Sequence, residues 1–223
     1  MTESHVAEKV RSRETETAIL EAARDLLAHG GLDALSMRAV AAKVGLSATA
    51  IYHWFEGKED LVDRVVLHGF QRSESYMWKA IEHLPAGSMD RVSALGEAYI
   101  RFALENREYF KIIFAIQTPA PRHNDDVPGQ GGYRVLRQCV VEAMEAGNIR
   151  RGEPDLVVLY LWSLVHGLVT IFMACDPKEM LAETECCSDL DEKNFSIGLF
   201  TRFHDMVREG LEPEGVRGGG CDA

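Results

Sequence analysis

A short segment near residue 50 carries small and polar side chains that could bind the edges of nucleic-acid bases. Ala48, Thr49 and His53 fall on one side of a helix predicted from residue 48 to about residue 54. A low, non-bulky face of this kind suits insertion into a DNA major groove. Lys58 follows at the start of the next predicted helix, where its ammonium and the free backbone amides could both face a phosphate. The chemistry predicted here is hydrogen bonding to DNA.

Two serine caps and a glycine are predicted to position this segment. Ser36 is a suitable N-cap for the preceding helix, since its hydroxyl can accept a hydrogen bond from a free amide of the first turn. The apolar residues of that helix recur at helical spacing and form one stripe: Met37, Val40, Ala41 and Val44. Gly45 ends the helix, because glycine enters the left-handed conformation without a steric penalty. Ser47 then caps the helix that begins at Ala48, so the sequence predicts a helix-turn-helix.

Residues 15–67 resemble the DNA-binding domain of the TetR family of bacterial transcriptional regulators. The resemblance is carried, in order, by the helix end AARDLLAHGG, the helix-turn-helix SMRAVAAKVGLS and the run IYHWFEGKEDL. It implies an all-α fold, with a three-helix DNA-binding domain over residues 13–57. A larger helical domain over residues 58–210 is expected to bind an effector and to form a dimer.

The resemblance also implies which residues contact DNA. Arg38 matches a family position that contacts a base or a phosphate, and arginine can bind guanine through two parallel hydrogen bonds. A solvated surface arginine is the alternative. Tyr52 and Lys58 match phosphate contacts, which position a protein without specifying a sequence. The predicted DNA-binding residues are Ser36, Arg38, Ser47, Ala48, Thr49, Ala50, Tyr52, His53 and Lys58. Because the two alanines offer only methyl groups, sequence preference is expected to depend on Arg38, Thr49 and His53, or on DNA shape.

The charge of the chain is unusual for a DNA-binding protein. The 223 residues carry a formal net charge of −11, whereas phosphate contacts need positive groups. Between residues 36 and 58, however, the cations Arg38, Lys43 and Lys58 accompany the single acid Glu56, which gives this segment a charge of +2. We therefore expect a local positive face on an acidic protein, weak non-specific binding to DNA and strong dependence of binding on salt.

Both ends of the chain are predicted to be disordered, over residues 1–12 and 211–223. Lys9, Arg11 and Arg13 could contact a DNA minor groove, as basic arms do, or belong to a solvated tail. The polar N-terminus lacks the apolar core of an export signal. Together with cysteines read as reduced thiols, this predicts a cytoplasmic protein.

The segment from Asp155 to Cys175 is the most apolar in the chain and is long enough to span a bilayer. Polar residues interrupt it, both flanks are acidic, and nothing basic marks a cytoplasmic side. We therefore interpret it as a helix buried between its own domain and a partner subunit, with no membrane involved. Its motif WSLVHGL, residues 162–168, resembles a subgroup of the same family with a Trp-x-x-x-His-Gly signature.

Pairing this helix and the last predicted helix, 191–209, with their copies would form a four-helix interface in a C2 homodimer. The predicted interface residues are Val158, Trp162, Val165, Val169, Leu199, Phe200, Phe203 and Met206. Two reading heads held in this way could bind an inverted repeat in double-stranded DNA.

The larger domain is rich in aromatic and methionine side chains, which favours an apolar or planar ligand. The candidate ligand-binding residues are Trp78, Tyr99, Phe102, Phe110, Phe114, Trp162, His166 and Met173, and each could instead be core packing. His166 could bond a polar ligand group or satisfy a buried carbonyl. The helix predicted from Lys58 to about His83 joins both domains, and the resemblance implies that it carries ligand-driven motion. The segment 117–132, with three prolines, is expected to be a loop that could cover a pocket.

Two other classes of function stay open. Cys186 and Cys187 are adjacent, with Cys175 upstream, so a thiol-redox or metal-responsive regulator is one alternative. Metal-binding Cys-x-x-Cys spacing is absent, and adjacent cysteines rarely form a disulfide with each other. A dimeric helical scaffold without operator binding is the other alternative. Because no phosphate loop, HExxH motif or nucleophile elbow is present, we predict no enzyme activity, no metal and no cofactor. The sequence favours a repressor released from its operator by a small apolar or aromatic ligand.

Overall fold

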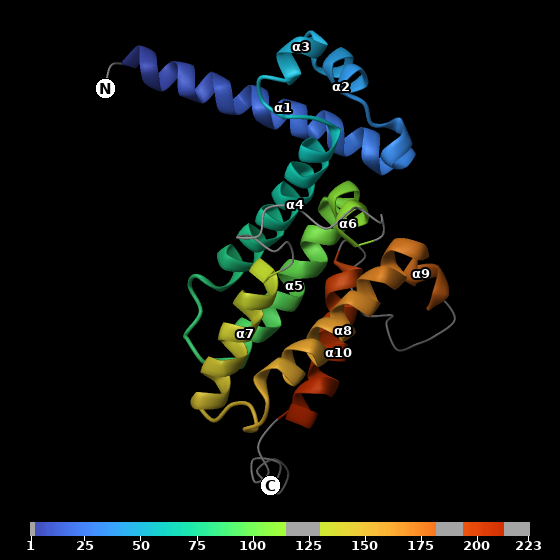
Figure 1. The fold of residues 1–223 in the computed structure, drawn as a ribbon. Helices are drawn as coiled ribbons and strands as arrows, with labels where there is room; N and C mark the ends of the chain where they lie inside the picture. The colour runs from blue at the N-terminus through green and yellow to red at the C-terminus, as the bar shows by residue number, and fades with distance from the viewer. Residues whose placement is uncertain (1–2, 115–129, 182–193, 212–223) are drawn as a thin grey trace, which may run out of the picture. The chain divides into compact units, whose positions relative to one another are not determined.

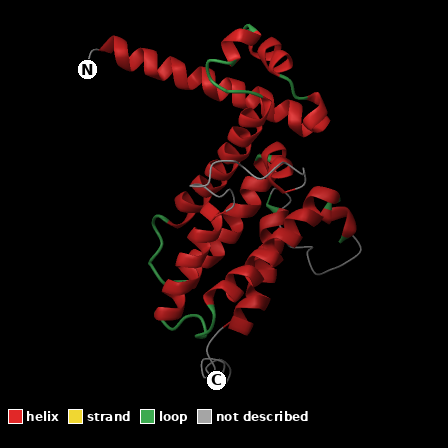
Figure 2. Ribbon diagram, in the orientation of Figure 1, coloured by secondary structure: helices red, strands yellow, loops and turns green. Residues whose placement is uncertain are grey.

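The structure is a computed structural model, and it describes residues 3–114, 130–181 and 194–211. All regular elements within these ranges are helices, which confirms the predicted all-α class (Figures 1 and 2). In chain order they are α1 Glu3–Ala34, α2 Met37–Val44, α3 Ala48–Ile51, α4 Lys58–Ile81, α5 Met89–Glu105, α6 Arg107–Phe114, α7 Gln130–Glu145, α8 Pro154–Ala174, α9 Pro177–Met180 and α10 Phe195–Leu211. The predicted tail after residue 211, the pair Cys186 and Cys187, and most of the predicted loop 117–132 lie outside the described residues.

The chain divides into two compact units. The first unit comprises Met1–Arg72 and Asn106–Gly129, and the second comprises Ser73–Glu105 and Gln130–Ala223. The first unit thus groups the beginning of α4 and the whole of α6 with the helix-turn-helix, whereas the sequence analysis placed the domain boundary at residue 58. The division falls inside α4, which is one continuous helix.

The core of the first unit is built from apolar stripes on α1, α2, α3 and α4. Its fully buried members are Ile19, Ala23, Leu27, Leu35, Val40, Ile51, Phe55, Leu61 and Val65. Ile19, Ala23 and Leu27 of α1 recur at helical spacing, as do Leu61 and Val65 of α4, so each of these helices presents one face to the core. Leu35 and Phe55 enter the core from the connections that precede α2 and α4. Removing this apolar area from water is the main force that holds the reading head together.

A second layer in the first unit forms where α6 packs against α1 and α4. The hydroxyl of Tyr109 lies 2.8 Å from Nδ1 of His68 on α4. The guanidinium of Arg24 on α1 lies 5.2 Å from the centre of the Tyr109 ring, which is cation–π geometry. At Gly69 an added Cβ would come within 3.0 Å of Tyr109, so only glycine permits this close approach of α4 to α6.

The second unit packs α7, α8 and α10 around α5. Tyr99, Ile100, Phe102 and Ala103 of α5 are buried in its core. An added Cβ at Gly96 would collide with the ring of Phe200, so this glycine lets α10 lie directly against α5. On the outside, Tyr133 and Arg137 of α7 both donate hydrogen bonds to Asp155 at the start of α8.

The N-terminal arm is the first correction to the sequence analysis. Residues 3–12, predicted to be disordered, form the first turns of α1, which begins at Glu3. The reason is local, because no proline or glycine occurs before Gly30 and the arm is rich in residues that favour a helix. At the other end of α1, Gly31 has φ 65° and breaks the regular helix where the sequence predicted its end.

Two further elements differ from expectation. Regular α-helix in the recognition segment ends at Ile51 and continues as a tight turn, in which the amides of His53 and Trp54 bond the carbonyls of Ala50 and Ile51. α7 begins at Gln130, so the last three residues of the predicted loop are helical.

Candidate nucleic-acid interface

The helix-turn-helix is held by the caps that the sequence predicted. The Oγ of Ser36 accepts a hydrogen bond from the Ala39 amide, and the Oγ of Ser47 accepts one from the Ala50 amide, each at 3.1 Å. Gly45 has φ 71°, in the left-handed region, and the Leu46 amide after it bonds the Ala41 carbonyl at 2.9 Å. Both serine oxygens therefore act as acceptors within the fold, and each hydroxyl keeps its own proton as a further hydrogen-bond donor.

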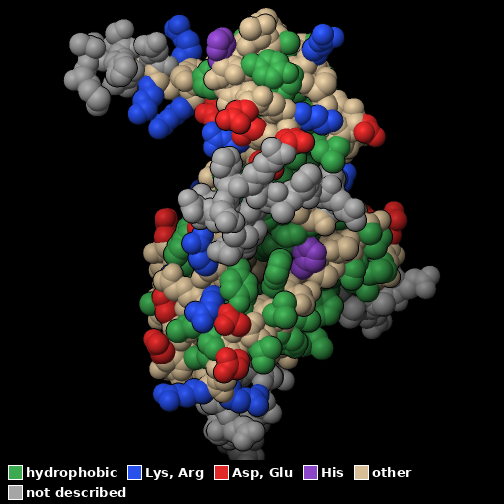
Figure 3. Space-filling view, viewed as in Figure 1, with side chains coloured by type: hydrophobic (Ala, Val, Ile, Leu, Met, Phe, Trp, Pro, Cys, Tyr) green, Lys and Arg blue, Asp and Glu red, His purple; other side chains and the backbone are tan. Residues whose placement is uncertain are grey.

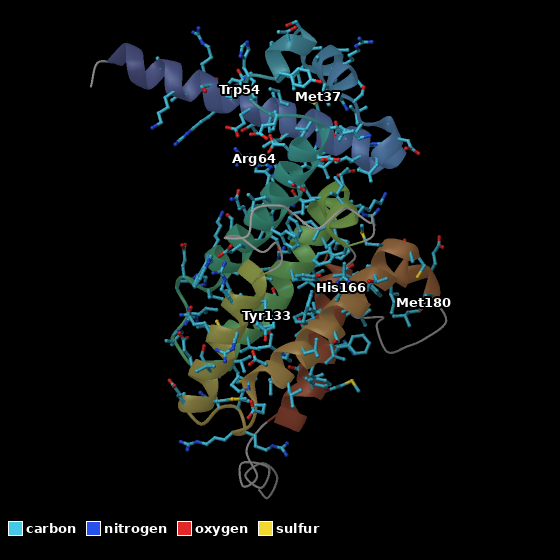
Figure 4. All side chains as sticks on the ribbon, viewed as in Figure 1. Met37, Trp54, Arg64, Tyr133, His166 and Met180 are labelled. Atoms are coloured by element: carbon cyan, nitrogen blue, oxygen red, sulfur yellow. The ribbon has the colours of Figure 1, made fainter. Side chains whose placement is uncertain are left out.

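The outer face of α3 brings together most of the predicted reading residues. Thr49, Tyr52 and His53 are exposed, and Ala48 and Ala50 are half-buried beside them. Their neighbours Ile51 and Phe55 are buried in the core of the unit. Because α3 is anchored by these two apolar side chains and by the Ser47 cap, its polar face has a fixed orientation on the reading head. Trp54 lies half-buried in the turn that follows (Figure 4).

The cations of this segment differ in how far their charge is already compensated. Arg38 is exposed, and within the described part of the chain no acidic side chain pairs with it. Lys43 donates to Asp25 of α1 at 2.7 Å, and Arg24 donates to the same carboxylate at 2.6 Å. Partial burial would raise the pKa of Asp25, but the hydrogen bonds from Lys43 and Arg24 outweigh it and hold this pKa below its usual range. Asp25 is thus ionised at neutral pH and offsets the charge of Lys43.

Lys58 is held by the end of α1. Its Nζ donates to the carbonyl of Leu32, although the side chain remains exposed. The N-terminus of α4 also has acids beside it, because Glu59 and Asp60 lie in its first turn and the carboxylate of Asp60 accepts a hydrogen bond from the preceding Glu56 amide at 2.9 Å. The anion site expected at this helix end therefore already faces a carboxylate. A phosphate contact by Lys58 stays a prediction, with part of its donor capacity in use.

The candidate ligand residues of the second unit meet in one polar group. The hydroxyl of Tyr99 on α5 lies 2.8 Å from Nδ1 of His166 on α8, which Figure 4 labels. Trp162 hydrogen-bonds the same Tyr99 side chain, and its ring lies 6.2 Å from that of His166. Burial lowers the pKa of His166 and raises the pKa of Tyr99 far above its usual range, so both groups are neutral at pH 7. The Trp-x-x-x-His spacing thus places two side chains, one helical turn apart, on a single tyrosine.

The other candidates are divided between the units. Trp78 is exposed on α4 and donates its indole N–H to Glu74 at 3.1 Å, so it lies on the surface of the second unit. Phe110 and Phe114 belong to the first unit, where Phe114 lies edge-on to Phe70 with ring centres 6.2 Å apart. Phe102 is fully buried against Tyr76, and Met173 is half-buried on α8.

Most of the predicted dimer-interface residues are already buried within the single chain, so their place in a dimer interface stays a prediction. Val158, Val165 and Val169 are buried within the second unit, as are Leu199 and Phe200 of α10. Trp162 faces Tyr99 instead. Of the predicted set, only Phe203 and Met206 present a large exposed apolar surface. The sequence could not separate the two faces, because α8 is apolar all round.

The opposite face of α8 is apolar and exposed. Large hydrophobic side chains with between 42% and 72% of their surface exposed lie on α8 and α10: Leu156, Leu159, Tyr160, Leu164, Ile171, Phe203 and Met206. Hydrophobic side chains gather over this region of the second unit in Figure 3. By length and composition alone α8 could cross a membrane, and 17% of its most apolar stretch is buried. We call these seven residues the α8–α10 face.

One group in the structure had no clear sign in the sequence. The set of Arg24, His68 and Tyr109 joins three helices from distant parts of the chain, and only the aromatic richness of residues 106–116 pointed toward it. The cysteines give little support to thiol chemistry in the described residues: Cys139 is buried and burial raises its pKa, while Cys175 is exposed on the last turn of α8.

Comparisons with known proteins match both units. Residues 19–65 match the family model of bacterial regulatory proteins of the tetR family, and residues 92–183 match that of a tetracyclin repressor-like C-terminal domain. The HTH-type transcriptional regulator UidR of Escherichia coli (strain K12) is 30% identical over 74 residues, which are 33% of this chain. The chain spans 38% of the length of that relative.

Solved structures share the fold over most of the chain. A protein of unknown function from Rhodococcus sp. RHA1 has 24% sequence identity and a TM-score of 0.72, over 89% of this chain and 96% of that one. The TetR family transcriptional regulator PfmR from Thermus thermophilus has 22% identity and a TM-score of 0.64, over 87% and 99%. The fatty acid degradation regulator FadR from Bacillus halodurans has 14% identity and a TM-score of 0.62, over 86% and 93%.

Proposed function

Because the chain belongs to the TetR family of bacterial regulatory proteins, we propose that it is a homodimeric repressor that binds an inverted-repeat operator and is released by a small ligand. The observation that carries the proposal is the geometry of α3. Two serine caps and a left-handed glycine hold this helix, so that its small and polar face is exposed and its apolar face is buried. A regulator of this kind acts in the cytoplasm and needs no catalytic group.

Each residue of the reading head has a distinct proposed role. Arg38 contacts a base, for which guanine is the best partner, because it is exposed and its charge is not offset by an acid in the described chain. Thr49 and His53 hydrogen-bond base edges from the exposed face of α3, and the methyl groups of Ala48 and Ala50 meet thymine methyl groups. Tyr52, with 56% of its surface exposed, binds a phosphate together with Lys58 and the hydroxyls of the two caps.

The α8–α10 face supports the dimer. A monomer seldom exposes a continuous apolar patch of this kind unless it contacts a partner. From Leu156 to Ala174, α8 contains no Asp, Glu, Lys or Arg, although acids outnumber cations in the chain by 35 to 24. A second copy, related by a two-fold axis, would cover the face with the same residues and place two reading heads on one operator.

The effector is proposed to bind within the second unit, near Tyr99, Trp162 and His166. Tyr99 and Trp162 are aromatic and His166 is neutral, so the ligand class that fits these three side chains is a small apolar or aromatic molecule. A polar group on such a ligand would compete for the Tyr99 hydroxyl or for His166. Ligand binding would favour a conformation of the dimer whose heads no longer fit successive major grooves, and only the difference in ligand affinity between the two conformations can drive release. Because α4 is continuous across the division between the units, it is the element that could carry this change.

The proposal is tested first by selection of bound duplexes from a random DNA pool at near-physiological salt. An enriched inverted repeat supports a dimeric, sequence-specific regulator, and its half-site spacing gives the distance between the heads. If the folded, dimeric protein enriches no sequence, the regulator proposal is wrong and the scaffold alternative takes its place.

Two variants then test the roles of the reading residues on the selected operator. Arg38→Ala should weaken binding and relax base preference at one position, since a bidentate contact contributes about 1–3 kcal/mol of discrimination. Tyr52→Ala should weaken binding equally on all sequences. Lys79→Ala removes an exposed cation from the second unit and is the matched control. If both reading-head variants bind as the control does, the assignment of the DNA-binding face is wrong.

A further inference from the structure

α1 extends well beyond the core of the first unit. Its first buried residues are Ile19 and Leu20, and no described side chain between residues 7 and 18 is buried. The sixteen residues from Glu3 to Ala18 therefore form a helical extension about 24 Å long, at 1.5 Å per residue. In Figure 1 this extension passes beyond α3 of the same unit.

The extension carries three exposed cations within five residues: Lys9, Arg11 and Arg13. In Figure 3, basic side chains lie on both sides of this part of the chain. The acids among its described side chains are Glu14 and Glu16, and Glu16 lies 3.9 Å from Arg64 of α4. Over residues 3–18 the four acids Glu3, Glu8, Glu14 and Glu16 outnumber the three cations, but residues 9–13 carry all three cations and no acid. This local run of positive charge, on the unit that carries the helix-turn-helix, points to a polyanion as partner.

The directions of the two arginines differ, and two contacts further along α1 allow us to assign them. Arg24 faces Tyr109 of α6, whereas the next residue, Asp25, faces Lys43 of α2. Arg13 precedes Arg24 by eleven residues, or about three helical turns, and so lies on the α6 side. Arg11 precedes Asp25 by fourteen residues, or about four turns, and so lies on the α2 side, toward the helix-turn-helix.

We propose that Arg11 binds the DNA backbone beside the half-site read by α3, as a phosphate contact made by a rigid helix. The inference rests on the proposed function, because it requires that α2 and α3 face DNA. A flexible basic arm could enter the minor groove, but a helix about 10–12 Å in diameter is too wide for a groove about 6 Å wide. The contact is therefore made with phosphates, and it strengthens binding without selecting a sequence.

The test compares Arg11→Ala with Arg13→Ala, which removes the same charge two residues away on the other side of the helix. Alanine favours the helix at either position, and circular dichroism checks that the helix content is unchanged. Affinity for the selected operator is measured at several salt concentrations. Arg11→Ala should make the slope of log K against log salt shallower by about 0.9 per protomer, or about 1.8 for the dimer, whereas Arg13→Ala should leave the slope unchanged.

A second experiment uses two altered duplexes. One is shortened so that it ends at the outer edges of the half-sites, and the other has a different sequence in the spacer between the half-sites. The difference between the parent and Arg11→Ala should disappear on the duplex that lacks the contacted phosphates and should not depend on the replaced sequence. If both variants show the same slope on the full duplex, or if the difference persists on every shortened duplex, the inference is wrong. Failure of the parent protein to select any operator would instead count against the proposed function.

Discussion

Replacing Leu159 with glutamate should dissociate the dimer without unfolding the protomer. Leu159 is 53% exposed in the single chain and belongs to the α8 part of the α8–α10 face. A glutamate there remains hydrated in the monomer, so the fold of the second unit should tolerate it. In the dimer the same carboxylate would be buried against the apolar face of a second copy, which costs several kcal/mol unless a partner charge is present.

The size of the effect follows from the exposed area. The seven residues of the α8–α10 face are on average about half exposed, and a large side chain buries about 150–200 Å², so they offer roughly 600–700 Å² per protomer. A standard interface buries about 800 Å² per partner, so this face forms most of a stable interface. The exposed part of Leu159 would be covered by the partner in the dimer. At about 25 cal/mol per Å², losing this apolar contact removes roughly 2 kcal/mol of binding free energy per protomer. Two copies then lose about 4 kcal/mol, which weakens dimerisation on the order of a thousandfold.

The assay is sedimentation or light scattering over a range of protein concentrations, with thermal unfolding measured in parallel. Met180→Glu is the matched control, because Met180 is 57% exposed on α9 but does not belong to the α8–α10 face. Leu159→Glu should be monomeric at concentrations where the parent and Met180→Glu are dimeric, and it should lose operator binding with dimerisation. A dimeric Leu159→Glu protein with the dissociation constant of the parent would refute the assignment of the interface. A parent protein that is monomeric at every concentration would refute the dimer itself.

Three further predictions concern individual contacts. Ser47→Ala removes the cap of α3 and should lower the free energy of unfolding by about 1 kcal/mol. It should also lose more operator affinity than Ser47→Gly, because glycine is tolerated at N-caps. Equal operator affinity of the alanine variant and the parent would show that the cap is dispensable. Tyr109→Phe removes the hydrogen bond to His68 but keeps the ring under Arg24, so it should lower the free energy of unfolding by about 1 kcal/mol in chemical denaturation. Tyr109→Leu should lower the free energy of unfolding further, because it also removes the ring. Equal stability of the two variants would contradict the cation–π contact. Burial lowers the pKa of His166 below its ordinary value of 6.5, so its neutral form stabilises the fold above pH 6.5, and this contribution is lost as the pH falls below that value. His166→Gln should therefore lose less stability than the parent between pH 7.5 and 5.5. An identical loss in both proteins would mean that another group causes the acid sensitivity.

The parts of the site that depend on neighbouring residues were predictable from the sequence. Ser36, Gly45 and Ser47 act on backbone groups within a few residues, so their residue types were enough to predict the caps and the left-handed turn. The buried faces of α1 and α2 followed from apolar spacing for the same reason. The N-terminal arm was mispredicted because its polarity was read as disorder, although nothing in it disfavours a helix.

The parts that depend on long-range pairing were not predictable in this way. Phe110 and Phe114 are aromatic like Tyr99, but the choice of partner helix assigns them to the first unit. α8 shows the same limitation more clearly. Periodicity selects a buried face only when the opposite face is polar, and this helix is apolar around its whole circumference. What orients it is the pairing of Trp162 and His166 with Tyr99, which lies more than sixty residues away on α5.

The charge of the reading head can be reconsidered in the same terms. The sequence predicted a net positive segment between residues 36 and 58, but Lys43 is paired with Asp25 and Lys58 shares its donors with the Leu32 carbonyl. Arg38 and Arg11 are the exposed cations on the helix-turn-helix side whose charge no acid offsets in the described chain. With Lys58 added, at most about three cations per protomer are available to neutralise DNA charge, so the salt slope of the dimer should not exceed about 5 to 6. A steeper slope would require cations outside the reading head. A slope within this bound would mean that the affinity of this acidic protein depends mainly on hydrogen bonds and fit at α3, and that non-specific DNA competes weakly for it.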